Sequence, residues 1–125
     1  MELENVSGNT FFEAKKHDIY YRNFLKFQRL VEENFLREKS VAKYADWMNM
    51  TAKHLNRINQ TILGKSTIDI ILDRTILEAK RSLIFGQKSI SQIAEDLGYS
   101  DYSHFSKIFK NRTKKTPTEF LNHYQ

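Results

Sequence analysis

The sequence predicts an all-α protein of about seven helices, in which a long linker helix joins two similar subdomains. Helix breakers are rare, with one proline and four glycines among 125 residues, and this favours helices. Apolar residues recur at helical spacing along most of the chain. A stretch of about thirty residues also occurs twice, so that residues 39–71 align with residues 88–121, as an internal duplication would produce.

Composition limits the possible partners. Twenty Lys and Arg residues against fifteen Asp and Glu residues give a net charge of +5, which favours polyanions such as nucleic acid. The chain has no cysteine, which excludes disulfides and thiolate metal sites, and it has no secretory signal pattern. No apolar run approaches the roughly 20 residues of a membrane-spanning helix. We therefore expect a cytoplasmic protein without a membrane partner.

The first twenty residues differ from the rest. They contain Gly8 and the isolated pair Phe11 and Phe12 without sustained periodicity, so residues 1–20 are expected to form a flexible tail or a severed linker. A first helix should follow and end near Arg37. Its inward positions are expected at Tyr21, Phe24, Leu25, Phe27 or Gln28, Val31 and Phe35.

Each repeat begins with a short helix. Ser40 and Ser89 stand where an N-cap is needed, and Gln92 would complete a capping box with Ser89. One apolar stripe follows in each copy. The stripes consist of Val41, Tyr44, Ala45 and Met48 in the first copy and of Ile90, Ile93, Ala94 and Leu97 in the second.

A sharp turn and a second helix complete each repeat. Asn49 and Gly98 are residue types that tolerate the left-handed conformation with which a helix ends. Thr51 and Ser100 are expected to cap the next helix, which requires the alignment to skip Asp101. The inward residues of this helix would be Leu55 and Ile58, or Phe105, Ile108 and Phe109. This order of elements predicts a helix-turn-helix unit in each half.

A longer helix over residues 67–85 connects the units, which would occupy residues 21–66 and 86–125. Ser66 and Asp69 form its N-terminal signature, and it should end before Gly86. Its inward face would consist of Ile68, Ile71, Leu72, Ile76, Ala79 and Leu83. At 1.5 Å per residue the helix spans roughly 28 Å, close to the roughly 34 Å between successive major grooves on one side of DNA.

Two such units predict binding to double-stranded DNA, because the second helix of a helix-turn-helix lies in the major groove. The outward face of that helix carries Lys53, Asn56, Arg57 and Gln60 in the first unit and Tyr102, Ser103, His104, Ser106 and Lys107 in the second. Such side chains suit hydrogen bonding to base edges. Lys110, Arg112 and Lys114 are expected to contact phosphates.

Residues 22–124 resemble the DNA-binding domain of the AraC/XylS family of bacterial transcription regulators. The resemblance rests on Ile93, Ala94, Gly98, Tyr99, Phe105, Phe109, Thr116, Pro117 and Phe120. It implies base contacts by Lys53, Asn56 and Arg57 and by Ser103, His104, Ser106 and Lys107. It also implies RNA polymerase as a further partner and an N-terminal effector or dimerisation domain that is missing here. The chain is therefore expected to be either an excised C-terminal domain, which the irregular opening favours, or a small stand-alone member of the family. Asn49 and Lys114 replace glycines that are usual in the family, which predicts altered loops.

Other functions have less support. Gly64, Lys65 and Ser66 resemble the end of a phosphate-binding loop, but the earlier glycine and the preceding strand are lacking. The four histidines form no metal-ligand pattern, and no nucleophile with a base is evident. We therefore expect no enzyme, cofactor or metal. Two alternatives remain, a protein-interaction module that contacts another regulator or RNA polymerase, and an architectural protein that binds DNA without sequence preference.

Overall fold

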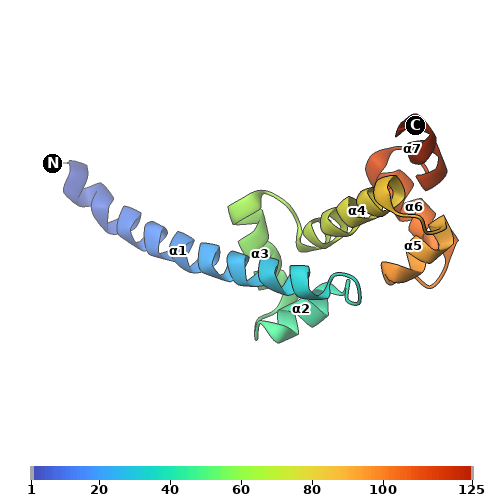
Figure 1. Ribbon diagram of the computed structural model, residues 1–125. Coiled ribbons are helices and arrows are strands. Elements are labelled where there is room, and N and C mark those ends of the chain that lie inside the picture. The colour runs from blue at the N-terminus through green and yellow to red at the C-terminus, as the bar shows by residue number, and fades with distance from the viewer. Residues whose placement is uncertain (1, 125) are drawn as a thin grey trace. The chain divides into compact units, whose positions relative to one another are not determined.

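The computed structural model describes the backbone of residues 2–124 and the side chains of residues 10–124, and this part of the chain contains seven α-helices and no strand (Figure 1). The all-α prediction is therefore confirmed. The helices are α1 (Glu2–Asn34), α2 (Val41–Trp47), α3 (Ala52–Leu63), α4 (Thr67–Phe85), α5 (Ile90–Asp96), α6 (Tyr102–Thr113) and α7 (Pro117–Tyr124). None of the described helices is both long enough and apolar enough to span a membrane.

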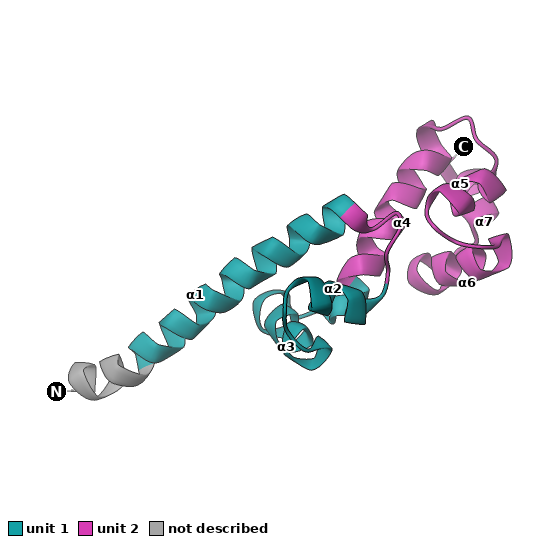
Figure 2. Ribbon diagram, turned by 90° about the horizontal axis from the view of Figure 1, so that it is seen from below, with its two compact units in different colours: residues 1–33, 40–69 teal, residues 34–39, 70–125 magenta. Residues whose placement is uncertain are grey.

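The chain folds into two compact units (Figure 2). Unit 1 contains residues 1–33 and 40–69, and unit 2 contains residues 34–39 and 70–125. This division differs from the expected one, because most of α4 packs within unit 2 and is not a separate connector. The short segment after α1 also belongs to unit 2, although the chain on both sides of it belongs to unit 1.

Residues 1–20 were expected to form a flexible tail or a severed linker without regular structure, whereas helix α1 begins at Glu2. The reason is visible in the burial pattern. Residues 10–19 are all exposed, so this part of the helix has no buried face that would impose an apolar periodicity. Its Lys, Glu and Ala residues nevertheless favour helix. The pattern becomes recognisable only at Tyr20, which is the first buried residue of α1.

Unit 1 encloses an apolar core between α1 and the α2–α3 pair. Tyr20 is buried in place of the expected Tyr21, which is 49% exposed. The rings of Phe27 and Tyr44 pack edge to face with centroids 5.6 Å apart. The buried residues of this core are Tyr20, Phe24, Phe27, Val31, Tyr44, Ala45, Met48, Leu55 and Ile58.

The caps predicted for unit 1 are present. Ser40 accepts a hydrogen bond from Lys43 N, and Thr51 accepts one from His54 N at 3.0 Å. Asn49 between these helices has φ 57°, the left-handed value that leaves a helix. The helix-turn-helix geometry of this unit is therefore set by short-range hydrogen bonds.

Unit 2 packs α5, α6 and α7 against α4. Its core consists of Ile76, Ala79, Leu83, Ile93, Ala94, Leu97, Tyr99, Phe105 and Phe109. Phe120 of α7 packs edge to face on Phe109 with centroids 5.5 Å apart. At the start of α4, which belongs to unit 1, Ile68 was expected to face inward but is 38% exposed. The buried face of α4 follows Thr67, Ile71 and Thr75 at four-residue steps, and Ile68 lies beside it.

Two local predictions for unit 2 are wrong. Asp101 caps α6 by accepting a hydrogen bond from His104 N at 2.7 Å, so Ser100 is not the N-cap. The additional residue in the second repeat is therefore Ser100. Ser89 caps α5 as expected, but the Gln92 amide donates to Asp96 at 2.9 Å, so this side chain does not complete a capping box.

The loop before α7 keeps its shape despite the missing glycine. Lys114 has φ 71°, and the equivalent Gly64 of the first repeat has φ 72°, so the expected change in loop shape is not observed. Thr116 and Glu119 then form a reciprocal capping box, with N···O distances of 3.0 and 3.1 Å. The hydrogen bond from the Thr116 backbone N–H lowers the pKa of Glu119.

Candidate nucleic-acid interface

We call α3 and α6 the reading helices, because each is the second helix of its helix-turn-helix. Helix α3 places Lys53, Arg57 and Gln60 on one exposed side, at the three- and four-residue steps of a single helix face. Leu55 and Ile58 on the opposite side are fully buried. The buried side fixes the rotation of α3 about its axis, and the polar side chains therefore point outward together.

Asn56 belongs to the same face of α3 but is also part of the fold. Its Oδ1 accepts a hydrogen bond from Thr67 N, the first residue of α4, at 2.9 Å. Thr67 Oγ1 in turn accepts a hydrogen bond from the buried Asn59 side chain at 2.9 Å. The side chain of Asn56 is thus oriented by α4, with its Nδ2 group as the remaining donor.

Helix α6 presents the equivalent surface in unit 2. Tyr102, Ser103, His104 and Lys107 are exposed, and Ser106 is half-buried. The His104 ring packs edge to face on Tyr99 with centroids 5.3 Å apart. In unit 1 the equivalent His54 packs in the same way on Tyr20 of α1 at 5.8 Å. Both histidines therefore support their reading helix by a ring contact.

A basic recess lies at the C-terminal end of α6. It has a volume of about 420 Å³ and is lined by Lys107, Lys110, Asn111 and Lys114. Three ammonium groups on one short helical segment form a local positive field. The structure thus brings together three of the residues predicted to contact DNA.

Arg112 is placed elsewhere. Its guanidinium donates to Asp73 of α4 at 2.6 Å, and the Arg112 side chain is only 20% exposed. The ion pair holds α6 against α4, and Arg112 does not line the basic recess. We therefore leave this residue out of the proposed DNA contacts.

Lys39 is a residue whose environment the sequence did not indicate. Its Nζ donates to Phe35 O at 2.7 Å and to Leu97 O at 2.5 Å, and it lies 5.0 Å from the centre of the Tyr99 ring. Burial lowers the pKa of Lys39 to about 8, against a smaller raising effect of Glu38. The equivalent Lys88 instead forms an exposed ion pair with Asp96, so the repeat gave no signal for this contact.

Within residues 10–124, His, Asp and Glu side chains form no group of three or more that could hold a metal ion. The prominent features of the surface are instead the two polar helix faces and their neighbouring cations.

Comparison with known proteins agrees with this architecture. The sequence profile of a helix-turn-helix domain family matches residues 44–123. The thermoregulatory protein LcrF of Yersinia pestis is 30% identical over 112 residues, which cover 90% of this chain and 41% of that relative. The chain thus spans less than half the length of that relative.

Solved structures show the same fold. A transcriptional regulator with an AraC-type DNA-binding domain from Chromobacterium violaceum has 27% identity and a TM-score of 0.67, covering 77% of this chain and 86% of that one. The DNA-binding domain of AdpA, solved in complex with a target DNA, has 16% identity and a TM-score of 0.72, covering 80% and 90%. The chain belongs to the AraC-type family of helix-turn-helix transcription regulators.

Proposed function

We propose that this chain binds double-stranded DNA in a sequence-specific manner and thereby regulates transcription, with α3 and α6 as its two reading helices. The observation that carries the proposal is the equivalent exposed polar face on the second helix of both repeats. The AdpA domain, which shares the fold, was solved with DNA bound, and this supports the proposal. The net charge of +5 agrees with a polyanionic partner.

The side chains suggest a division of roles. Arg57 can donate two hydrogen bonds to a guanine, and Gln60 has the amide that pairs with adenine. In unit 2 the equivalent base contacts would come from Ser103, His104 and Lys107. Tyr102 and Ser106 belong to the same face of α6 and would contribute at the edge of this contact surface. Lys53 is a further base contact on α3. Lys110 and Lys114 are proposed phosphate contacts, which supply affinity and orientation but no sequence information.

Two reading helices on one chain predict an asymmetric DNA site. The two units differ in the side chains of their reading faces, so the two blocks of the site should differ in sequence. The length of α4 favours insertion into successive major grooves about 34 Å apart. We further propose that the complete regulator contains an effector or dimerisation domain, because the chain spans only 41% of its relative LcrF. RNA polymerase is proposed only as a partner that regulation of transcription would use.

Selection of bound duplexes from a randomised DNA pool by the purified protein, followed by sequencing, tests the proposal. We expect enrichment of two different blocks about ten base pairs apart. Enrichment of a single block would mean that one unit serves only as a phosphate clamp. Binding without any enrichment would favour the architectural alternative, and no binding would favour the protein-interaction module.

A variant extends the same experiment. Arg57→Ala should lower affinity for the selected duplex by roughly 1 to 3 kcal/mol and relax selection at one position of one block. Unchanged discrimination between selected and scrambled duplexes would remove Arg57 from the base-reading residues.

A further inference from the structure

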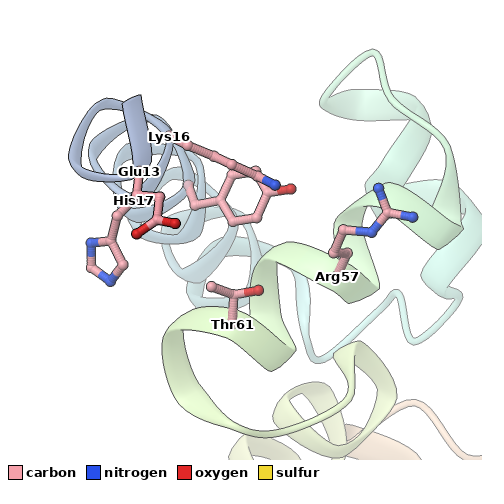
Figure 3. Close-up of a pocket in the computed structure, with 6 residues that line it drawn as sticks. Glu13, Lys16, His17, Arg57 and Thr61 are labelled. Atoms are coloured by element: carbon pink, nitrogen blue, oxygen red, sulfur yellow. The ribbon is translucent and has the colours of Figure 1, made fainter. Parts of the chain in front are cut away.

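Helix α1 runs beside the reading helix of unit 1. The edge-to-face contact between Tyr20 of α1 and His54 of α3, at 5.8 Å, joins the two helices near the start of α3. Beyond this contact the two helices border a shared recess of about 210 Å³ (Figure 3). The recess is lined by Glu13, Lys16, His17, Tyr20, Arg57 and Thr61.

The recess has cations on both walls. Lys16 Nζ lies 5.4 Å from the centre of the Tyr20 ring, a cation–π contact that orients the ammonium group. Figure 3 shows Lys16 extending from α1 toward the side on which Arg57 stands on α3, while His17 points away from Arg57. The lining of the recess therefore includes two permanent cations, Lys16 and Arg57, and one carboxylate, that of Glu13.

The dimensions of DNA assign this recess to the sugar-phosphate backbone. A helix with its side chains is about 10 to 12 Å in diameter, and the major groove of B-DNA is about 12 Å wide. When α3 occupies the groove, α1 beside it has no room to enter. Arg57 belongs both to the exposed polar face of α3 and to the lining of the recess. The recess therefore lies at the edge of the surface that would face DNA, where the phosphates of the strand bordering the groove are within reach.

We propose that Lys16 binds a DNA phosphate at this recess, next to the bases that Arg57 and the rest of the α3 face read. This inference rests on the proposed function, because it requires α3 to enter a groove. It makes the extension of α1 before Tyr20 a further DNA-contacting element, formed by a segment that the sequence suggested was a tail. The group that Lys16 binds is a phosphodiester in the backbone of the bound DNA duplex.

The test compares two neighbouring lysines on the selected duplex. Lys15 is the matched control, because its Nζ lies 4.8 Å from the Phe11 ring on the same helix and does not line the recess. The release of counterions by one phosphate contact predicts that Lys16→Ala weakens binding about 15-fold at about 50 mM salt and about fourfold at about 200 mM. Lys15→Ala should leave affinity within about twofold of wild type at both salt concentrations.

Two further measurements sharpen the test. Glu13→Gln removes a carboxylate that would repel the phosphate, so the affinity for the selected duplex should rise. Lys16→Ala should leave the ratio of specific to random-duplex affinity unchanged, because a phosphate contact carries no sequence information. Helical circular dichroism would verify that each variant is folded.

Failure of this inference differs from failure of the proposed function. If the wild type enriches no sequence and binds no duplex, the proposed function is wrong. If the wild type binds its selected duplex but Lys16→Ala retains its affinity and salt dependence, the phosphate site is wrong. Equal losses in Lys15→Ala and Lys16→Ala would also overturn it, because they would indicate diffuse attraction by the charge of α1.

Discussion

The side chain of Asn56 on the reading helix α3 accepts a hydrogen bond from the backbone N–H of Thr67 at the start of α4, at 2.9 Å. The first N–H groups of a helix have no partner within the helix. Asn56 satisfies one of them from outside and so links a proposed base-reading position to the stability of the following helix. Structural and DNA-binding roles at this position should therefore be separable by substitution.

Two variants of Asn56 should separate these roles. Asn56→Ala removes the acceptor for Thr67 N and should lower the free energy of unfolding by about 1 kcal/mol, the typical effect of losing a helix cap. Asn56→Asp keeps an acceptor at the N-terminus of a helix and should retain wild-type stability. The same carboxylate should weaken DNA binding by repelling the DNA. Urea unfolding and duplex titration measure the two effects, and a destabilised Asn56→Asp would contradict the capping role.

Arg112 and Lys110 provide a second pair of variants. Arg112 bonds Asp73 at 2.6 Å, whereas Lys110 is exposed and lines the basic recess. Arg112→Ala should lower the free energy of unfolding by about 1 to 2 kcal/mol, because it breaks a partly buried ion pair and removes its packing. Lys110→Ala should leave the free energy of unfolding within about 0.5 kcal/mol of wild type. It should reduce the slope of log affinity against log salt concentration by about 1, the contribution of one phosphate contact.

The comparison of these two variants decides the role of Arg112. If Arg112→Ala left stability unchanged and reduced the salt dependence as Lys110→Ala does, Arg112 would contact phosphate and its pairing with Asp73 would be incidental. Asp73→Ala is the control, because it breaks the same ion pair without removing a cation.

The two helix-turn-helix turns should respond differently to substitution. Gly98 has φ 90°, and a Cβ there would overlap the carbonyl oxygen of Leu36. Gly98→Ala should therefore destabilise the protein by at least about 2 kcal/mol, from left-handed strain and from the clash. Asn49 adopts φ 57° as a non-glycine residue, so Asn49→Gly relieves strain but makes the unfolded chain more flexible.

For Asn49→Gly these two effects oppose each other, and we expect a change within about 0.5 kcal/mol. Chemical denaturation of both variants beside wild type would test the contrast. A mild effect of Gly98→Ala would show that the segment after α1 can move away from the turn.

Much of the fold could be predicted from the sequence, because the informative signals are local. The positions of Ser40, Thr51 and Ser89 as caps depend on hydrogen bonds within three residues, and the structure confirms them. The repeat predicted two similar units because the same local signals occur in both copies. Where the repeat gained a residue, sequence similarity alone placed Ser100 as a cap, whereas the hydrogen bond identifies Asp101.

The unpredicted features depend on contacts between distant segments. The alignment of the repeats suggested nothing about Lys39, whose partner Leu97 is 58 positions away. The sequence likewise gave no indication that Arg112 pairs with Asp73, 39 positions earlier. The exposed part of α1 carries no periodicity, so neither its helical form nor its position beside α3 was predictable. The reading faces on α3 and α6 were recognised because they repeat, but their DNA contacts remain a proposal.

Tyr99 should make the protein sensitive to high pH. The ring is buried, and its hydroxyl has no hydrogen-bond partner in the described structure. Burial raises the pKa of Tyr99 to about 12, against a smaller lowering effect of Arg112. An unfolded tyrosine ionises near about pH 10. Above that pH the unfolded chain releases the Tyr99 proton while the folded protein retains it, so the free energy of unfolding should fall between pH 10 and 12.

The variant Tyr99→Phe isolates this effect. Removing a buried hydroxyl without a partner should leave stability at pH 7 unchanged or raise it by up to about 1 kcal/mol. Urea unfolding at a series of pH values should then show that, as the pH rises from 10 toward 12, the free energy of unfolding falls less for the variant than for wild type. Tyr21→Phe is the control, because Tyr21 is 49% exposed. The opposite outcome would be that the free energies of unfolding of Tyr99→Phe and wild type change in parallel between pH 10 and 12. The Tyr99 hydroxyl would then ionise equally in the folded and unfolded states, and its burial would not explain a loss of stability at high pH.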